Sequence, residues 1–389
     1  MKDSKRRTSK ILTGNVLLLS IVSFLTDTSS EMIFPILPLF IVALGGTGIV
    51  LGLIGGIGDS VSSILKVFSG YISDKIGKRR VLVYAGYQTS AISKLFFALA
   101  TLWQHLLILS PIERLGKGIR TAPRDALIAE SVVERGKGFG IHRAFDTAGA
   151  ILGSTLALIF VLFFSFGFRT IFLIAGSVAF LALVPIIFLR EKAKPTTKSI
   201  NLKIGLKELP RPLKFFIIIA TIFAVGNFSY FFFILRAQQF FSAELSIVGP
   251  LALYIVFNVI YAGLSIPSGI LSDKVGRKKV LIAGYTLFAF VCIGFTQLYS
   301  FAYLILLFVL YGFVFALVDA NQRAFVSDLA YEDLKGTALG TFHTAIGLAV
   351  LPGSIIAGFL WDFINPTATF LYGAILAFLA VALFVIISE

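Results

Sequence analysis

The sequence contains a single cysteine, Cys292, and its three histidines lie far apart along the chain. One cysteine excludes an intramolecular disulfide and any cysteine-based metal cluster, and scattered histidines argue against a metal site. The chain also lacks the G-x-x-x-x-G-K-[ST], H-E-x-x-H and G-x-S-x-G motifs of nucleotide hydrolases, metalloproteases and serine hydrolases. We therefore expect no metal, no cofactor and no enzymatic activity.

Charged residues are scarce as well. They make up 14% of the 389 residues, while 57% are hydrophobic and the mean hydropathy is +0.93. These values exclude an ordinary soluble globular protein and are typical of a chain embedded in a lipid bilayer. The net charge of +14 does not indicate nucleic-acid binding, because the basic residues lie in short loops between apolar runs rather than on one soluble face.

Twelve runs reach the length of about 20 residues that a helix needs to cross a bilayer. The fourth and the tenth are unusually polar. The predicted limits are 11–44, 48–72, 80–101, 103–130, 138–163, 168–190, 213–241, 246–272, 280–300, 302–329, 336–360 and 366–388. The predicted fold is therefore an all-α integral membrane protein, with six helices in each of two halves (1–190 and 213–389) and a cytoplasmic linker at 191–212.

The distribution of lysine and arginine predicts the orientation in the membrane. The loops on the side of the N-terminus carry 24 of these residues, whereas the loops on the opposite side carry Arg169 alone. Loops rich in lysine and arginine stay in the cytoplasm. We therefore expect a multi-pass protein of the cell membrane with both termini in the cytoplasm.

One turn occurs twice in the chain. Gly70 to Arg80 reads GYISDKIGKRR, and Gly269 to Lys279 reads GILSDKVGRKK, 199 residues later. Two copies at half-chain spacing indicate two homologous halves, which is a known plan of transporters. In each copy we expect the glycines to permit close packing and a turn, and the aspartate to bind the N-terminus of another helix. The predicted conformational-switch residues are Gly70, Asp74, Gly77, Arg79, Arg80, Gly269, Asp273, Gly276 and Arg277.

The repeated pattern, G-x-x-x-D-[RK]-x-G-[RK]-[RK]-[RK], resembles the signature loop of the major facilitator superfamily, between its second and third helices. Arg114-x-x-Lys117-Gly118 resembles the family's R-x-x-Q-G-x-G motif in the fourth helix, with lysine in place of glutamine. Gly149 to Ser154 partly resembles the drug/proton-antiporter motif G-x-x-x-G-P, with serine in place of proline. The resemblance implies secondary transport, with the first, fourth, seventh and tenth spans lining a central cavity, and its antiporter part favours export.

Ionisable residues inside the predicted spans are the candidate functional groups, because charges in a bilayer normally face a bundle interior or a wet cavity. In the first span, Asp27 and Glu31 are four residues apart and share one helix face. Two neighbouring acids are suited to reversible protonation; alternatively, either acid neutralises a neighbouring arginine. In the fourth span, Arg114 and Lys117 share one side of the helix with Thr121, Arg124 and Asp125. We expect the last two to brace the signature loop.

The fifth span begins with His142, Arg143 and Asp146, which fall on one part of the helix surface. Histidine is a plausible proton carrier near neutral pH, and a structural salt bridge between the halves explains the cluster equally well. The second half contributes fewer charges. Its candidates are Asn227, Tyr230, Asp319 and Arg323, beside aromatic residues that face either a ligand or lipid.

These observations predict a secondary active transporter, coupled to protons, that moves a small polar or anionic, amphiphilic solute by alternating access. Export is the favoured direction. We expect Asp27 or Glu31 to pair with Arg114 until substrate binds. The alternatives are an uncoupled facilitative carrier and a multidrug/proton antiporter for lipophilic cations. The expected partners are a small-molecule substrate, protons and the lipid bilayer, with no nucleic acid, and the protein is expected to be a monomer.

Overall fold

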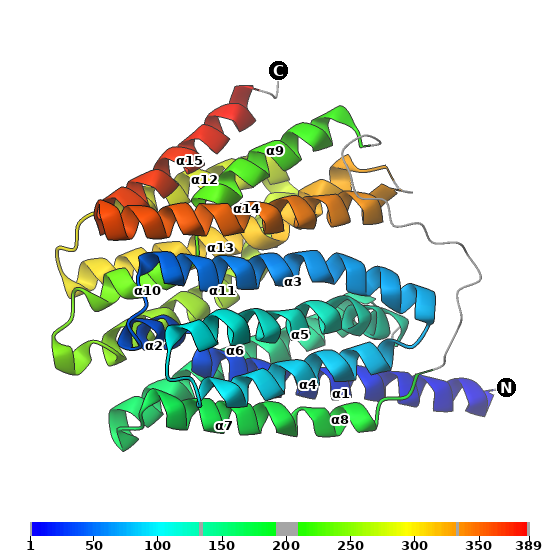
Figure 1. Cartoon of the computed structure of the whole chain (residues 1–389). Helices are drawn as coiled ribbons and strands as arrows, with labels where there is room; N and C mark the ends of the chain where they lie inside the picture. Colours follow the sequence, from blue (N-terminus) through cyan, green and yellow to red (C-terminus); the bar gives the residue numbers. More distant parts are fainter. Residues whose placement is uncertain (1, 132–134, 192–208, 332–333, 387–389) are drawn as a thin grey trace. The chain divides into compact units, whose positions relative to one another are not determined.

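The computed structural model describes residues 2–131, 135–191, 209–331 and 334–386. In these ranges the chain is helical apart from short connections (Figure 1). The helices are α1 (Lys2–Ile33), α2 (Leu37–Ala43), α3 (Gly48–Ile76), α4 (Arg79–Phe97), α5 (Trp103–Glu130), α6 (Arg135–Phe164), α7 (Phe168–Leu181), α8 (Leu183–Ile187), α9 (Arg211–Gly226), α10 (Phe231–Gln238), η1 (Ala243–Leu245), α11 (Val248–Val275), α12 (Arg277–Phe295), α13 (Phe301–Leu329), α14 (Lys335–Phe363) and α15 (Pro366–Ile386).

Each of the twelve predicted spans corresponds to one helix or to one interrupted pair of helices, and the predicted fold class is confirmed. Ten stretches of the described residues are long and apolar enough to cross a membrane. The third and fourth spans, α4 and α5, are not among them, because both carry polar and charged residues. The tenth span, α13, is among them, so the prediction that it is unusually polar was wrong.

The first and the seventh spans, which both carry candidate site residues, are interrupted. The first span ends as α1 at Ile33 and resumes as α2 at Leu37, across a turn that contains Pro35. Proline removes a backbone donor and obstructs the preceding turn of a helix, which accounts for this break. The seventh span ends as α9 at Gly226 and resumes as α10 at Phe231. Interrupted membrane helices are typical of transporter binding sites.

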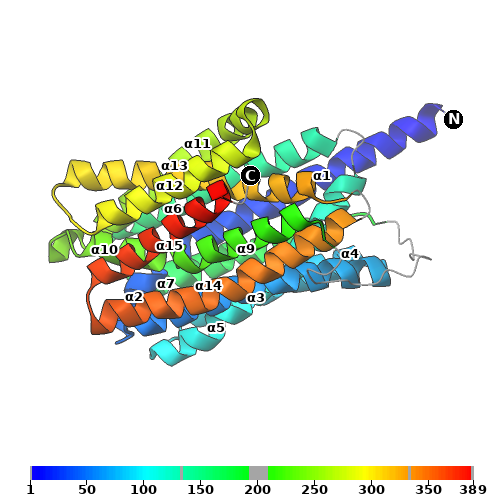
Figure 2. The ribbon, with the colours of Figure 1, turned by 90° about the horizontal axis from the view of Figure 1, so that it is seen from above.

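The chain divides into two compact units. Unit 1 comprises Met1–Ile36 and Val61–Asn201, and unit 2 comprises Leu37–Ser60 and Leu202–Glu389. Within unit 1, α1 packs along α6, and α4 lies between α5 and α7 (Figure 1). Within unit 2, α12 lies beside α13 and α15 (Figure 2). The predicted halves and the linker at 191–212 stay a prediction, and 192–208 lie outside the described residues.

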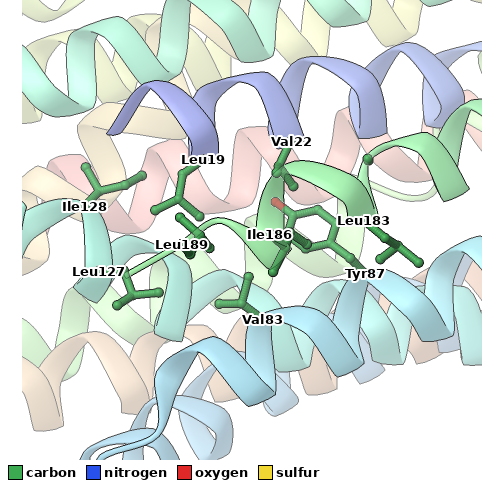
Figure 3. Packing of buried hydrophobic residues seen from close by; sticks show 10 residues of the cluster. Leu19, Val22, Val83, Tyr87, Leu127, Ile128, Leu183, Ile186 and Leu189 are labelled. Atoms are coloured by element: carbon green, nitrogen blue, oxygen red, sulfur yellow. The ribbon is translucent and has the colours of Figure 1, made fainter. Parts of the chain in front are cut away.

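The two units have different cores. Figure 3 shows aliphatic side chains from α1, α4, α5 and α8 packed in one cluster in unit 1, with Tyr87 beside Ile186. Unit 2 is held by aromatic pairs, including Phe223 on Tyr285 with ring centroids 3.9 Å apart and Phe233 on Tyr311 at 4.2 Å. Stacked rings contribute about 0.5–1.5 kcal/mol per pair beyond their buried area. Many of the 40 phenylalanines therefore stabilise unit 2 from inside.

Candidate functional site

A pair of aspartates joins α1 to α6 inside unit 1. The carboxyl groups of Asp27 on α1 and Asp146 on α6 lie close enough for each to act on the other. Ser23, one turn before Asp27, donates its hydroxyl to Asp146 Oδ1 at 2.8 Å and lies 3.4 Å from Asp27 Oδ2. Two neighbouring carboxyl groups repel each other when both are ionised, which makes this pair a candidate proton site. Both acids were predicted site residues, in separate clusters of the sequence, and the structure brings them together.

Arginines lie on both sides of this acid pair. Arg143 Nη1 is 3.0 Å from Asp146 Oδ2, one turn earlier on α6. Arg124 of α5 donates to Asp125 Oδ1 at 2.9 Å, and its Nη1 is 3.4 Å from the Ser23 hydroxyl. The predicted proximity of Arg143 and Asp146 on one helix surface is therefore seen as an ion pair. Arg124 was assigned by the sequence to the signature loop, and it also contacts the serine that bridges the acids.

His142 is buried beside this cluster, with 5% of its surface exposed. Among the described residues its Nε2 has no hydrogen-bond partner. The charges of Asp146 and Arg124 act on the ring, although neither forms a hydrogen bond to that nitrogen. The predicted histidine thus lies at the acid pair, and its role as a proton carrier stays a prediction.

The basic residues Arg114 and Lys117 of α5 also belong to unit 1. The Arg114 guanidinium lies over the Phe34 ring, 4.3 Å from its centroid, and its Nε is 3.8 Å from Glu113 Oε2. Lys117 is one turn on, close enough for the charges of Arg114 and Asp27 to act on it. Glu31 is half-buried. The predicted pairing of Arg114 with Asp27 or Glu31 stays a prediction, and the contacts of Asp27 given above are to Ser23 and Asp146.

A second buried network contains residues that the sequence analysis did not place in the site. Lys94 of α4 is fully buried, and its Nζ donates to Ser29 Oγ at 3.1 Å and Ser30 Oγ at 2.7 Å. Glu113 of α5 has 1% of its surface exposed, and the charges of Lys94 and Glu113 act on each other. The signal available in the sequence was a lysine inside an apolar run, which a bilayer tolerates only with a counter-charge.

Arg120 extends this network toward the core of unit 1. Its Nη1 donates to Ser90 Oγ at 2.5 Å, and its guanidinium lies 4.5 Å from the centroid of the Tyr87 ring. Ser90 in turn donates to the backbone carbonyl of Glu113 at 2.9 Å. The charged side of α5 is thus fixed to α4 along several turns, which holds Arg114 and Lys117 in a defined orientation.

The two signature loops turn at glycines, as predicted. Gly77 has φ +67° and Gly276 has φ +96°, a region that favours glycine. A Cβ on Gly70 would lie 3.3 Å from Ala122 Cβ, which agrees with the predicted close packing, whereas one on Gly269 would have nothing within 4 Å among the described residues. The side chain of Asp74 lies outside what the structure describes, so its predicted contact stays a prediction.

The arginines of the two loops are paired within their own units. Arg79 Nη1 lies 2.5 Å from Glu130 Oε1, and Arg80 donates to the Ile187 carbonyl at 2.6 Å. The Glu191 carboxylate accepts the backbone N–H groups of Arg79 at 2.7 Å and Arg80 at 3.0 Å, so it caps the start of α4. In the second loop, Arg277 pairs with Asp273 at 3.1 Å and also with Asp328.

Unit 2 contains a cavity of about 180 Å³ between α9, α13 and α14. Its wall includes Asn227, directly after α9, and Asp319 and Gln322 of α13, with Phe223 and Phe315. Asp319 accepts hydrogen bonds from Tyr261 at 2.9 Å and Arg323 at 2.7 Å. The structure therefore brings two predicted site residues of this half, Asn227 and Asp319, to one cavity.

The other two predicted residues of this half do not line that cavity. Arg323 forms an ion pair with Asp319, which does line the cavity. Tyr230 lies in the break between α9 and α10, with its ring 5.7 Å from the Tyr254 ring. It packs among aromatic side chains.

Membrane-length helices with paired charges buried in their interior define a polytopic transport protein. Residues 19–263 and 217–389 match the family model of the Major Facilitator Superfamily. The chain belongs to this superfamily, and its members are transporters rather than enzymes.

Known proteins support this assignment. The chain is 52% identical over 373 residues to an "Uncharacterized MFS-type transporter" of Methanocaldococcus jannaschii, covering 95% of this chain and 94% of that one. It is 28% identical over 291 residues to the "Multi-drug resistance efflux pump PmrA" of Streptococcus pneumoniae serotype 4, covering 67% of each. The crystal structure of a mutant of the nucleoside transporter NupG has the same fold, with a TM-score of 0.81 at 14% identity over 96% of this chain and 100% of that one.

Proposed function

We propose that this transporter is a proton-coupled secondary carrier that moves a small polar or anionic, amphiphilic solute by alternating access, with export as its direction. The observation that carries the proposal is the pair of Asp27 and Asp146, which the Ser23 hydroxyl bridges between α1 and α6. A proton held between two acids from different helices is released or taken up when those helices change their contact. Such a pair converts a change of conformation into a proton movement.

The neighbouring arginines account for how the pair functions without its proton. Loss of the shared proton leaves two negative charges, and Arg143 at 3.0 Å from Asp146 and Arg124 at the bridging Ser23 stabilise them. An arginine keeps its charge at any working pH, so these residues act as fixed counter-charges. Protonation of the pair releases them to interact with an anion.

The charges of α5 support an anionic or zwitterionic substrate. Between residues 113 and 125 this helix carries four basic side chains and two acidic ones, the latter being Glu113 and Asp125. With Asp27 and Asp146 sharing a proton, unit 1 keeps an excess of positive charge near Arg114 and Lys117. An anion bound there restores the balance, and the Phe34 ring beside Arg114 favours a solute with an apolar part.

A second candidate is a multidrug/proton antiporter for lipophilic cations. The aromatic cavity of unit 2, with Asp319 in its wall, favours this alternative, as does the similarity to a multidrug efflux pump. In either case we propose a monomer in the cell membrane with both termini in the cytoplasm, which rests on the distribution of lysine and arginine between the loops.

The test begins with a thermal-shift screen of the purified chain against organic anions, zwitterions and lipophilic cations, because a ligand that binds the folded state raises its apparent stability. The best ligand is then followed in proteoliposomes with an imposed pH gradient. We expect Asp27→Asn and Asp146→Asn to abolish accumulation against the substrate gradient while exchange at equal pH persists. Glu244→Gln, in the exposed η1 segment, is the matched control.

Three results would contradict parts of this proposal. Accumulation by both aspartate variants at the wild-type rate would exclude the acid pair as the proton site. Wild-type protein that only equilibrates its substrate would indicate the uncoupled facilitative alternative. A cationic ligand whose transport survives Arg114→Ala and Lys117→Gln would favour the multidrug antiporter.

A further inference from the structure

A second pocket, of about 170 Å³, opens at one end of unit 2, where α9 and α12 begin and α13 and α15 end. Its walls are almost entirely apolar. Phe216 packs against Phe325 with ring centroids 4.8 Å apart and against Phe384 at 5.5 Å, and the half-exposed Phe215 and Leu329 extend the wall outward. By the predicted topology, this end of the unit faces the cytoplasm.

Lys278 is the charged residue in the wall of this pocket. Its Nζ lies 5.6 Å from the centroid of the Phe384 ring, a cation–π contact. Among the residues that the structure describes, no carboxylate pairs with this ammonium, because the neighbouring Asp328 and Asp273 both bind Arg277. An ammonium at the mouth of an apolar pocket is suited to a ligand that has both an anionic group and a hydrocarbon part.

The internal repeat explains why this lysine lacks an acid partner. At the offset of 199 residues, Lys278 corresponds to Arg79 and Leu329 corresponds to Glu130. Arg79 and Glu130 form an ion pair at 2.5 Å in unit 1. Unit 2 keeps the cation and has leucine in place of the acid.

At the corresponding end of unit 1, side chains of the protein occupy the space that is a pocket in unit 2. Leu189, after α8, packs with Val83 and Leu127 in the core of Figure 3. Glu191, two residues later, closes that end by capping α4. In unit 2 the place between the same four helix ends is the open pocket at Lys278.

We propose that this pocket binds an anionic phospholipid, with the phosphate at Lys278 and part of an acyl chain on the phenylalanine rings. Basic pockets between membrane helices on the cytoplasmic side are suited to anionic lipid headgroups. A soluble anion would leave the aromatic walls in water, whereas a lipid covers them. This site rests on membership of the membrane-embedded family and on the predicted topology, and it is independent of proton coupling and of the transported substrate.

The test compares lipids on the full-length protein purified in a neutral detergent. Native mass spectrometry and thermal unfolding are recorded with dioleoylphosphatidylglycerol, dioleoylphosphatidylcholine and glycerol phosphate. We expect the phosphatidylglycerol to bind in preference and to raise the unfolding temperature, and glycerol phosphate to have no effect. Lys278→Gln should weaken phosphatidylglycerol binding about fivefold, the factor that corresponds to about 1 kcal/mol for one lysine at a membrane surface. Lys279→Gln, at the exposed neighbouring residue, should bind as the wild type does.

A second experiment introduces an acidic side chain beside Lys278. Leu329→Glu introduces into unit 2 the acid that unit 1 has at Glu130. We expect this acid to form an ion pair with Lys278 and to remove the preference for phosphatidylglycerol. Leu329→Gln, its neutral control, should keep that preference. The proposal is overturned if the Lys278 and Lys279 variants weaken binding equally, if glycerol phosphate alone stabilises the protein, or if Leu329→Glu leaves the preference unchanged.

Discussion

The contact between α1 and α6 sets the distance between Asp27 and Asp146, and two glycines make that contact close. A Cβ added to Gly149 would lie 3.0 Å from the Cα and the carbonyl carbon of Phe24, and one added to Gly153 would lie 2.9 Å from the same atoms of Thr28. Asp27 lies between these two residues of α1, and Asp146 lies one turn before Gly149. A substitution that separates the helices therefore also separates the two acids.

The magnitude for Gly149→Ala follows from two opposing contributions. The new methyl group meets backbone atoms, which cannot rotate away, so the helices must move; overpacking of this kind costs about 1–3 kcal/mol. Replacing glycine by alanine inside a helix contributes up to about 1 kcal/mol in the opposite direction. With the full offset, the expected net loss is up to about 2 kcal/mol in the free energy of unfolding.

Gly140→Ala is the matched control, because it lies on the same helix and its Cβ would meet nothing within 4 Å among the described residues. It should leave stability unchanged or raise it by up to about 1 kcal/mol. Both variants are compared by chemical unfolding in mixed micelles and by proton-driven accumulation in proteoliposomes. We expect Gly149→Ala to lose accumulation more strongly than equilibrium exchange. Equal stability and equal coupling of the two variants would refute the reasoning that this packing positions the acid pair.

Two further predictions concern the paired charges of unit 1. Lys94→Met removes one of the positive charges that act on the buried Glu113, which keeps its contact with Arg114, and should lower the free energy of unfolding by up to about 3–5 kcal/mol, whereas adding Glu113→Gln should recover most of that loss; a double variant as unstable as the sum of the single ones would show that the residues act independently. Glu191→Ala removes the carboxylate that caps α4 and should cost about 0.5–2 kcal/mol, with a smaller loss for Glu191→Gln; thermal unfolding checks the order, and equal losses would argue that Arg79 and Arg80 find other acceptors.

The sequence was sufficient to predict the fold because its signals are local. Apolar runs of membrane length, two matching loops and a one-sided distribution of lysine and arginine each follow from neighbouring residues. The break at Pro35 has such a signal too. The break between Gly226 and Phe231 has a weaker one, since Asn227 to Tyr230 contain neither proline nor glycine.

The site was harder to predict because its contacts join distant parts of the chain. Helical periodicity places Asp27 and Glu31 on one face, and it cannot identify what faces them. The partner of Asp27, Asp146, is 119 residues further along and belongs to a helix that the sequence analysis treated as a separate cluster. Lys94 and Glu113 were visible as charges in membrane spans, yet their proximity depends on how α4 packs on α5.

The internal repeat predicts equivalent loops and also makes the differences between the units informative. Where unit 1 has Arg79 with Glu130, unit 2 has Lys278 with Leu329. Where α6 carries Arg143 and Asp146, the positions 199 residues later on α14 are the uncharged Phe342 and Ala345. Charges gathered in unit 1 are suited to protons and anions, whereas the aromatic interior of unit 2 is suited to apolar groups. Substitutions at matched positions of the two units therefore distinguish coupling from apolar binding more sharply than substitutions at either unit alone.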